Sequence, residues 1–68
     1  MKQIGNIVRE KRKSIGLSME KVSQKAGVSY RTILAIEQGR QVTTSTLLVV
    51  LKALGLEILI KDKEEALT

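Results

Sequence analysis

The sequence predicts an all-α fold, a compact bundle of four helices in one small domain. Three observations support this prediction. Apolar residues recur at three- and four-residue spacing, serine or threonine precedes several of these stretches, and glycine follows each of them. Glycine is favoured just beyond a helix because it enters the left-handed backbone region without a side-chain clash. The glycines that divide the chain in this way are Gly16, Gly27, Gly39 and Gly55.

Four helices follow from these signals in chain order. They are residues 3–15, a second helix with Ser18 as N-cap, a third with Ser29 as N-cap, and a fourth from Thr43 or Thr44 to Leu54. Their inward-facing residues are Ile4, Val8 and Ile15 in the first helix, Val22 and Ala26 in the second, Ile33 and Ile36 in the third, and Leu47, Val50, Leu51 and Leu54 in the fourth. Together these side chains form the predicted aliphatic core.

Residues 56–61 have a different pattern, which is short, β-branched in part and partly alternating, and this predicts a β-strand. No other strand is predicted, so its backbone groups need the same strand of a second molecule, antiparallel across a two-fold axis. A frayed helix or tail after Leu54 is the alternative. The chain is accordingly divided into a helical domain (residues 1–55), a dimerisation strand (56–62) and a tail (63–68).

The small size of the chain also favours a homodimer. A core of 68 residues is marginal, and the chain has no cysteine or histidine, so neither a disulfide nor a zinc site is expected to reinforce it. No metal or cofactor is predicted. Residues 47–51 are apolar almost all the way round their helix, which leaves Leu48 and Val49 to be covered by a partner. The predicted dimer interface is Leu48, Leu56, Ile58, Leu59 and Ile60.

Charge is distributed unevenly along the chain. The net charge is +5, and residues 1–40 carry nine Lys and Arg against three Glu, whereas residues 57–68 carry two Lys against four acids. A polyanionic partner would therefore meet the first forty residues, although a solvated basic surface is the alternative. The longest apolar run, residues 47–51, is too short for a membrane span, and no signal-peptide pattern opens the chain. A cytoplasmic protein without a membrane partner is expected.

An enzyme is the class that the composition favours least. Without His or Cys, the usual general bases and thiol nucleophiles are missing, and no acid pair or glycine-rich phosphate loop replaces them. No catalytic residue is predicted.

Residues 18–39 form the motif that indicates function. Two short predicted helices are joined by a tight turn over residues 26–29, where Gly27 permits the change of direction, Ala26 allows close helix contact and Val28 covers the corner. This is the plan of a helix-turn-helix motif. Its second helix projects N-terminal residues outward, and a helix fits the major groove of B-form DNA.

With this motif, the sequence resembles the lambda repressor/Cro-like, or XRE-type, helix-turn-helix family over residues 4–56. The matching residues are Ile4-Gly5, Val8-Arg9, Arg12, Gly16-Leu17-Ser18, Ala26-Gly27-Val28-Ser29, Ile33, Ile36-Glu37, Gly39-Arg40 and Ala53-Leu54-Gly55-Leu56. The resemblance implies a compact lambda-repressor-like bundle of four to five helices that binds double-stranded operator DNA as a transcription regulator. The C-terminal pattern is also similar to that of the HipB-type antitoxins, in which a strand joins two subunits. The resemblance to that subgroup implies a kinase toxin as an alternative partner and autoregulation of the operon.

One internal ion pair is expected from the sequence. Arg12 lies on the apolar stripe of the first helix and Glu37 on that of the third, and each charge alone would be costly to bury. The family resemblance points to the same pair. A contact of Arg12 with a DNA phosphate is the alternative role.

The family pattern also places the DNA contacts. Base contacts are expected from Ser29, Tyr30, Arg31, Thr32 and Ala35, with Arg31 foremost because guanidinium binds guanine O6 and N7 together. Phosphate contacts are expected from Ser18, Gln38, Arg40, Gln41, Thr43 and Thr44. The remaining cations of the first helix, Arg9, Lys11 and Lys13, are expected to be solvated surface charges, and electrostatic attraction of DNA at a distance is the alternative role.

Two positions depart from the family pattern. Met19 stands where the family commonly has Gln, and it cannot make the same hydrogen bonds. Val42 stands where the family often has Pro.

The predicted mechanism is a dimer that inserts its third helices into successive major grooves, about 34 Å apart, and represses transcription from an inverted-repeat operator.

Overall fold

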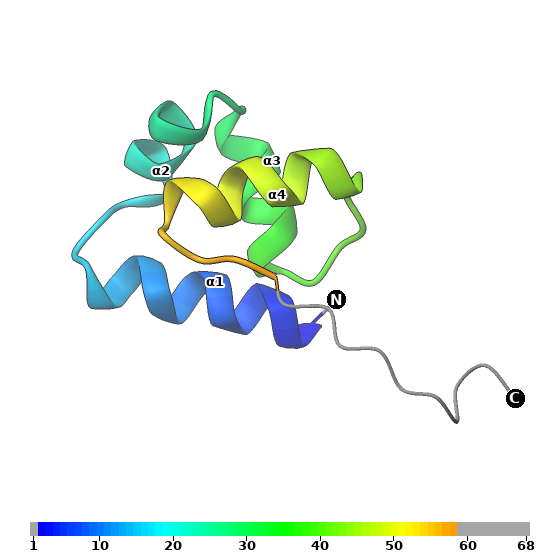
Figure 1. Ribbon diagram of the computed structural model, residues 1–68, viewed down its shortest axis with the longest axis horizontal. Helices are drawn as coiled ribbons and strands as arrows, with labels where there is room; N and C mark the ends of the chain where they lie inside the picture. The colour runs from blue at the N-terminus through cyan, green and yellow to red at the C-terminus, as the bar shows by residue number, and fades with distance from the viewer. Residues whose placement is uncertain (1, 59–68) are drawn as a thin grey trace, which may run out of the picture.

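In the computed structural model, which describes residues 2–58, four helices follow one another along the chain (Figure 1). They are α1 (Lys2–Ser14), α2 (Met19–Ala26), α3 (Tyr30–Glu37) and α4 (Thr44–Ala53). The prediction of an all-α bundle is confirmed, with four helices in the described part of the chain. Residues 56–58 have no regular secondary structure, and the rest of the predicted strand, with Leu59 and Ile60, lies outside the described residues. The dimerisation strand therefore stays a prediction.

Side-chain caps determine where three of the helices begin. Ser18, Ser29 and Thr43 have extended backbone angles, and their hydroxyl oxygens accept hydrogen bonds from the backbone N–H of Lys21, Thr32 and Thr46, at 3.0, 3.2 and 3.2 Å. Each bond satisfies an N–H group that has no partner within the helix. The helices therefore start one residue after the caps.

The turn between α2 and α3 depends on Gly27, whose φ is +72°. In this left-handed conformation its N–H donates to the carbonyl of Ser23 and ends α2, so that two residues later Ser29 caps α3. The other three glycines predicted to end helices also have positive φ.

The core is aliphatic, as the spacing predicted. Its buried side chains are Val8, Val22, Ile33, Ile36, Leu47, Val50, Leu51 and Leu54. Helix α3 packs against α1 and α2, and α4 packs against α2. The segment after α4 runs back between α4 and α1 (Figure 1). Within residues 2–58, no helix combines the length and the apolar composition that crossing a membrane requires.

The expectation for Ile15 is wrong. Helix α1 ends at Ser14, and the Ile15 side chain is 43% exposed. Because Gly16 reverses the chain, Leu17 packs against the core in its place, and its N–H donates to the Arg12 carbonyl at 3.0 Å. The apolar spacing predicts a helix that continues through Ile15, but α1 ends one residue earlier.

Candidate nucleic-acid interface

Helix α3 is buried on one side and open on the other. Ile33 and Ile36 are fully buried, which fixes the helix in the bundle. The residues predicted to contact bases surround its N-terminal half: Ser29 and Arg31 are exposed, Tyr30 is 47% exposed, and Thr32 and Ala35 are half-buried. The leading turn of α3 is therefore accessible to a partner.

A surface hollow of about 390 Å³ runs along the open side of α3. It is lined by Tyr30, Arg31, Leu34, Ala35, Gln38 and Arg40. The structure thus brings three predicted base-contacting residues together with two predicted phosphate-contacting ones. Leu34 was missed by the sequence analysis, although its spacing from Arg31, Ala35 and Gln38 is that of a single helical stripe.

The other predicted phosphate-contacting residues lie at helix starts and in the loop before α4. Ser18, Gln41, Thr43 and Thr44 are all exposed. A hydroxyl has one donor hydrogen and two acceptor lone pairs. Thr43 donates its hydrogen to the hydroxyl of Thr46 at 2.8 Å, whereas Ser18 only accepts within the described residues, from Lys21 N–H. The donor hydrogen of the Ser18 hydroxyl thus has no partner among these residues.

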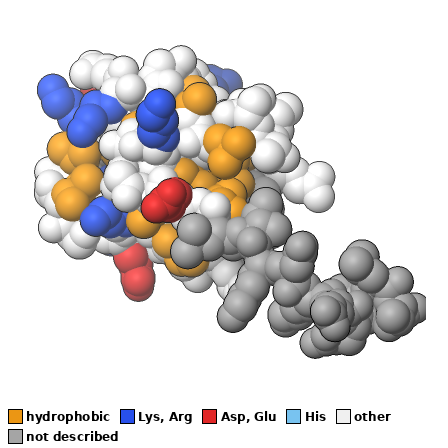
Figure 2. Space-filling view, viewed as in Figure 1, with side chains coloured by type: hydrophobic (Ala, Val, Ile, Leu, Met, Phe, Trp, Pro, Cys, Tyr) orange, Lys and Arg blue, Asp and Glu red, His pale blue; other side chains and the backbone are white. Residues whose placement is uncertain are grey.

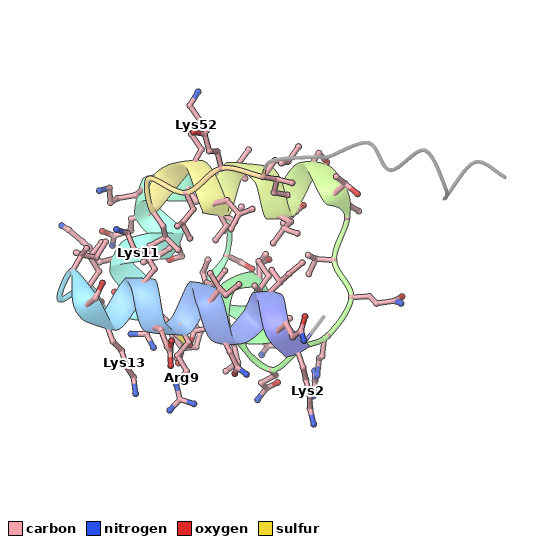
Figure 3. The ribbon with its side chains drawn as sticks, turned by 60° about the horizontal axis from the view of Figure 1, so that its bottom comes forward. Lys2, Arg9, Lys11, Lys13 and Lys52 are labelled. Carbon is pink, nitrogen blue, oxygen red and sulfur yellow. The ribbon has the colours of Figure 1, made fainter. Side chains whose placement is uncertain are left out.

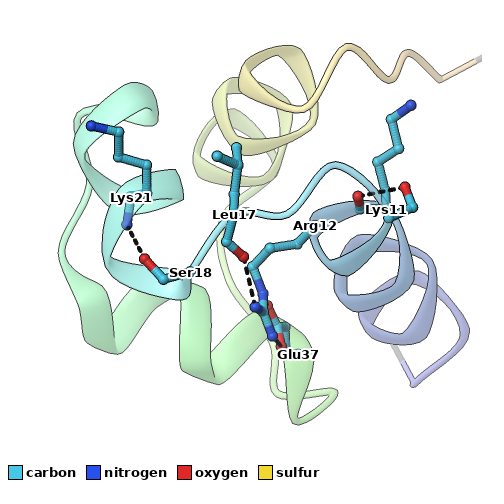
Figure 4. Close-up of polar contacts among 7 residues, drawn as sticks. Lys11, Arg12, Leu17, Ser18, Lys21 and Glu37 are labelled. Carbon is cyan, nitrogen blue, oxygen red and sulfur yellow. Dashed lines mark hydrogen bonds and ion pairs between the residues drawn. The ribbon is translucent and has the colours of Figure 1, made fainter.

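Arg12 and Glu37 lie together between α1 and α3 (Figure 4). Arg12 Nε donates to Glu37 Oε2 at 2.6 Å and Arg12 Nη2 to Oε1 at 3.1 Å, a two-pronged geometry that makes such pairs strong. Arg12 Nη1 also donates to the Leu17 carbonyl at 2.9 Å. The two side chains are only 12% and 7% exposed. One guanidinium therefore joins α1, the loop before α2 and the end of α3.

The hydrogen bond to Glu37 raises the pKa of Arg12 above its usual value. Because the pKa is raised in the folded state, the stabilisation that the ion pair gives the fold is fully present below the unfolded-state pKa of Arg12. It is lost only as pH rises through the folded-state pKa of Arg12. The guanidinium therefore stays charged throughout the neutral and mildly alkaline range, and the orientation of α3 should not depend on pH there.

A helix-turn-helix family model matches residues 8–60, which is most of the chain. The chain belongs to this helix-turn-helix family. The resemblance to XRE-type helix-turn-helix proteins noted in the sequence is thereby confirmed.

Two further comparisons agree with this assignment. An uncharacterised HTH-type transcriptional regulator from Methanothermobacter thermautotrophicus is 44% identical over 34 residues, which are 50% of this chain and 49% of that protein. The chain thus spans about half the length of the curated relative it matches. A chain in the solved structure of the HipA–HipB–O2–O3 complex superposes with a TM-score of 0.82 over 93% of this chain and 90% of that one. At 23% identity, this likeness shows a shared fold.

The position where this helix-turn-helix chain departs most from the family pattern is structurally explained. Met19, the first residue of α2, is half-buried and packs against the core. Its side chain therefore adds apolar contact where a polar residue was expected. Val42 also packs against the core, in the loop before α4.

This helix-turn-helix domain also leaves an apolar surface open. On the side where α4 lies, hydrophobic side chains reach the surface (Figure 2). Leu48 and Ile58 are each 45% exposed and Val49 is 42% exposed, whereas Leu56 packs half-buried against its own core. A groove of about 120 Å³ is lined by Ile4, Ile7, Leu51, Leu56, Glu57 and Ile58. Ile7, which is 54% exposed, was not singled out from the sequence.

Among the described residues, no three His, Cys, Asp or Glu side chains gather in a group that could hold a metal ion.

Proposed function

We propose that the chain binds double-stranded DNA sequence-specifically and regulates transcription, acting as a dimeric repressor on an inverted-repeat operator. The observation that carries this proposal is the exposed stripe of α3. Arg31 and Tyr30 project beside the hollow of about 390 Å³, while Ile33 and Ile36 anchor the opposite side of the helix in the core. A rigid helix with an open polar side is what major-groove recognition requires.

In this mechanism, the first turn of α3 lies between the two DNA backbones. Arg31 donates two hydrogen bonds to guanine O6 and N7, which discriminates against the wrong base by roughly 1–3 kcal/mol. Tyr30 contacts a thymine methyl group or a phosphate. Arg40 and Gln38, at the other end of the same hollow, contact the backbone and set the register of the helix.

Two copies of the chain would double the recognition site. A two-fold axis through the apolar surface of α4 and the segment after it would present two α3 helices to successive major grooves, about 34 Å apart. A dimer seated across a promoter would exclude polymerase. The exposed side chains of Leu48 and Ile58 support this association because covering their apolar surface removes it from water.

The experiment is selection of bound sites from a random pool of duplex DNA, followed by titrations of variants. Arg31→Ala should lose base preference at one position of each half-site, whereas Arg40→Ala should weaken binding to all duplexes and flatten the salt dependence. Lys52→Ala removes the same charge from α4 and serves as control. The Lys52 side chain points in the opposite direction from those of Arg9 and Lys13 in α1 (Figure 3). Failure of the wild-type chain to bind any duplex at low salt would refute the function. An unchanged preference in Arg31→Ala would refute only that residue's role.

A second candidate function is that of an antitoxin, which neutralises a toxin protein and represses its own operon. It is supported by the likeness to a chain found in a complex that contains both HipA and HipB, which extends over 93% of the present chain. The two functions are compatible in one molecule. Co-purification of the tagged chain with a larger protein encoded beside it would favour the antitoxin, and its recovery as a single species would oppose it.

A further inference from the structure

Two cations of α1, Arg9 and Lys13, face the same way. They are four residues apart, so they share one face of the helix, and Figure 3 shows both side chains pointing away from α4, as Lys2 does. Lys11 and Lys52 point in the opposite direction in the same view. The basic residues of α1 are therefore sorted onto two sides.

Arg9 and Lys13 line a hollow of about 250 Å³ between α1 and the end of α3. Arg12 and Met19 also line it, together with Leu34, Glu37 and Gln38 of the α3 end. Both carboxylate oxygens of Glu37 are engaged by Arg12. This is the one ion pair found within residues 2–58, so neither Arg9 nor Lys13 has an ion-pair partner among these residues.

The hollow adjoins the proposed DNA-contacting side of α3. Leu34 and Gln38 line both this hollow and the larger one beside Arg31 and Arg40. A helix inserted in a major groove has a phosphate backbone running along each of its sides. The hollow with Arg9 and Lys13 lies where one of these backbones would pass.

The first residue of α2 offers no polar side chain at this place. The thioether of Met19 is half-buried against the core and cannot donate a hydrogen bond. The hydrogen-bond donors that line the hollow thus come from Arg9, Lys13 and Gln38, together with Arg12, which is engaged by Glu37 and Leu17.

We propose that Arg9 and Lys13 together hold one phosphate group of the DNA backbone beside the groove that α3 enters. The two side chains form a clamp beside a preformed hollow, and neither has an ion-pair partner within residues 2–58, which distinguishes them from a diffuse basic surface. This inference rests on the proposed function, because it assigns further residues to the same interface.

The test compares two double variants that remove the same charge. Arg9→Gln/Lys13→Gln should bind a selected duplex and a random-sequence duplex each about tenfold more weakly at 0.1 M salt, with the slope of log affinity against log salt reduced by about 1. Lys11→Gln/Lys52→Gln, whose cations point the other way, should change affinity less than twofold. Fluorescence anisotropy of labelled duplexes measures both.

The phosphate itself can be located with neutral backbone substitutions. A duplex with a methylphosphonate at the clamped position should lose affinity for the wild-type chain but not for Arg9→Gln/Lys13→Gln. Equal losses in the two double variants, or no loss in either, would overturn the clamp. If the wild type binds and Arg31→Ala loses base preference while Arg9→Gln/Lys13→Gln behaves as wild type, the clamp alone fails. If the wild type binds no duplex, the proposed function fails with it.

Discussion

Two largely buried charged side chains, Arg12 and Glu37, connect α1 to the C-terminal end of α3. The sequence allowed this pair to be anticipated because both residues interrupt apolar stripes, where a lone charge would be costly. The third hydrogen bond, from Arg12 to the Leu17 carbonyl, could not be anticipated, since it depends on the path of the chain after Gly16. The pair contributes orientation as well as stability, because it fixes α3 relative to two other segments.

Breaking this pair should destabilise the fold severely. Arg12→Met or Glu37→Met leaves one charge mostly buried and unpaired, which costs about 3–5 kcal/mol. A domain of this size has about that much stability in total, so each single variant should be largely unfolded at 25 °C. The double variant Arg12→Met/Glu37→Met should regain most of the loss, because neither charge remains. Urea unfolding followed by circular dichroism measures all three, and single variants with wild-type midpoints would contradict the argument.

The cations of α1 were only partly predictable from the sequence. Arg9, Lys11 and Lys13 were grouped as solvated charges, although a helical period places Lys11 away from the other two. That period was available from the sequence. The hollow that Arg9 and Lys13 line could not be predicted from the sequence, because it is formed by residues of three helices that come together only in the fold.

At the scale of helices, the starts were predictable and one end was not. Each helix start is set by a cap, Ser18, Ser29 or Thr43, that bonds to a backbone N–H within the first turn. A few adjacent residues are therefore enough to predict it. The end of α1 depends instead on competition between Ile15, which continues the apolar stripe, and Gly16, which favours a left-handed turn. The turn prevailed because Leu17 fills the core when the chain reverses.

The approach of α1 to α3 is governed by Gly5, which is buried near the start of α1. A Cβ atom at this position would overlap the carbonyl oxygen of Ile36 and lie 3.1 Å from that of Glu37. Glycine lowers helix stability by about 1 kcal/mol relative to alanine, so its presence here reflects the close contact of the two backbones.

Gly5→Ala should therefore destabilise the protein despite the better helix propensity of alanine. Overpacking costs about 1–3 kcal/mol and outweighs the propensity gain, which predicts a net loss of about 1 kcal/mol and a Tm lower by about 4–8 °C. Asn6→Ala, at the exposed neighbouring position of α1, should leave Tm unchanged or raise it. Thermal unfolding of both variants decides the matter, and a Gly5→Ala protein as stable as Asn6→Ala would exclude a tight backbone contact.

At the scale of the whole molecule, the described residues form a folded unit with two different surfaces. The polar side of α3 and the cations of α1 suit a nucleic acid, and the groove lined by Ile4, Ile7 and Ile58 suits an apolar partner. The fold followed from local periodicity and capping. Association with a second copy could not be derived in the same way, because its geometry depends on contacts between two chains rather than on local patterns within one.

Covering the apolar groove with a second copy predicts a specific effect of charge at Ile58. Ile58→Lys should dissociate the dimer, since fully burying an isoleucine contributes about 1.5–3 kcal/mol and the 45% of Ile58 that is exposed accounts for about half of this. A two-fold interface loses this contribution twice, which raises the dimer dissociation constant by at least about tenfold. Ile15→Lys is the matched control, because Ile15 is 43% exposed against 45% for Ile58 but does not line the groove. Light scattering at micromolar concentration should show monomers for the first variant and dimers for the second, with wild-type circular dichroism for both. A dimer that survives Ile58→Lys would move the interface away from this groove. Loss of the dimer in both variants would trace the effect to added charge anywhere on the surface.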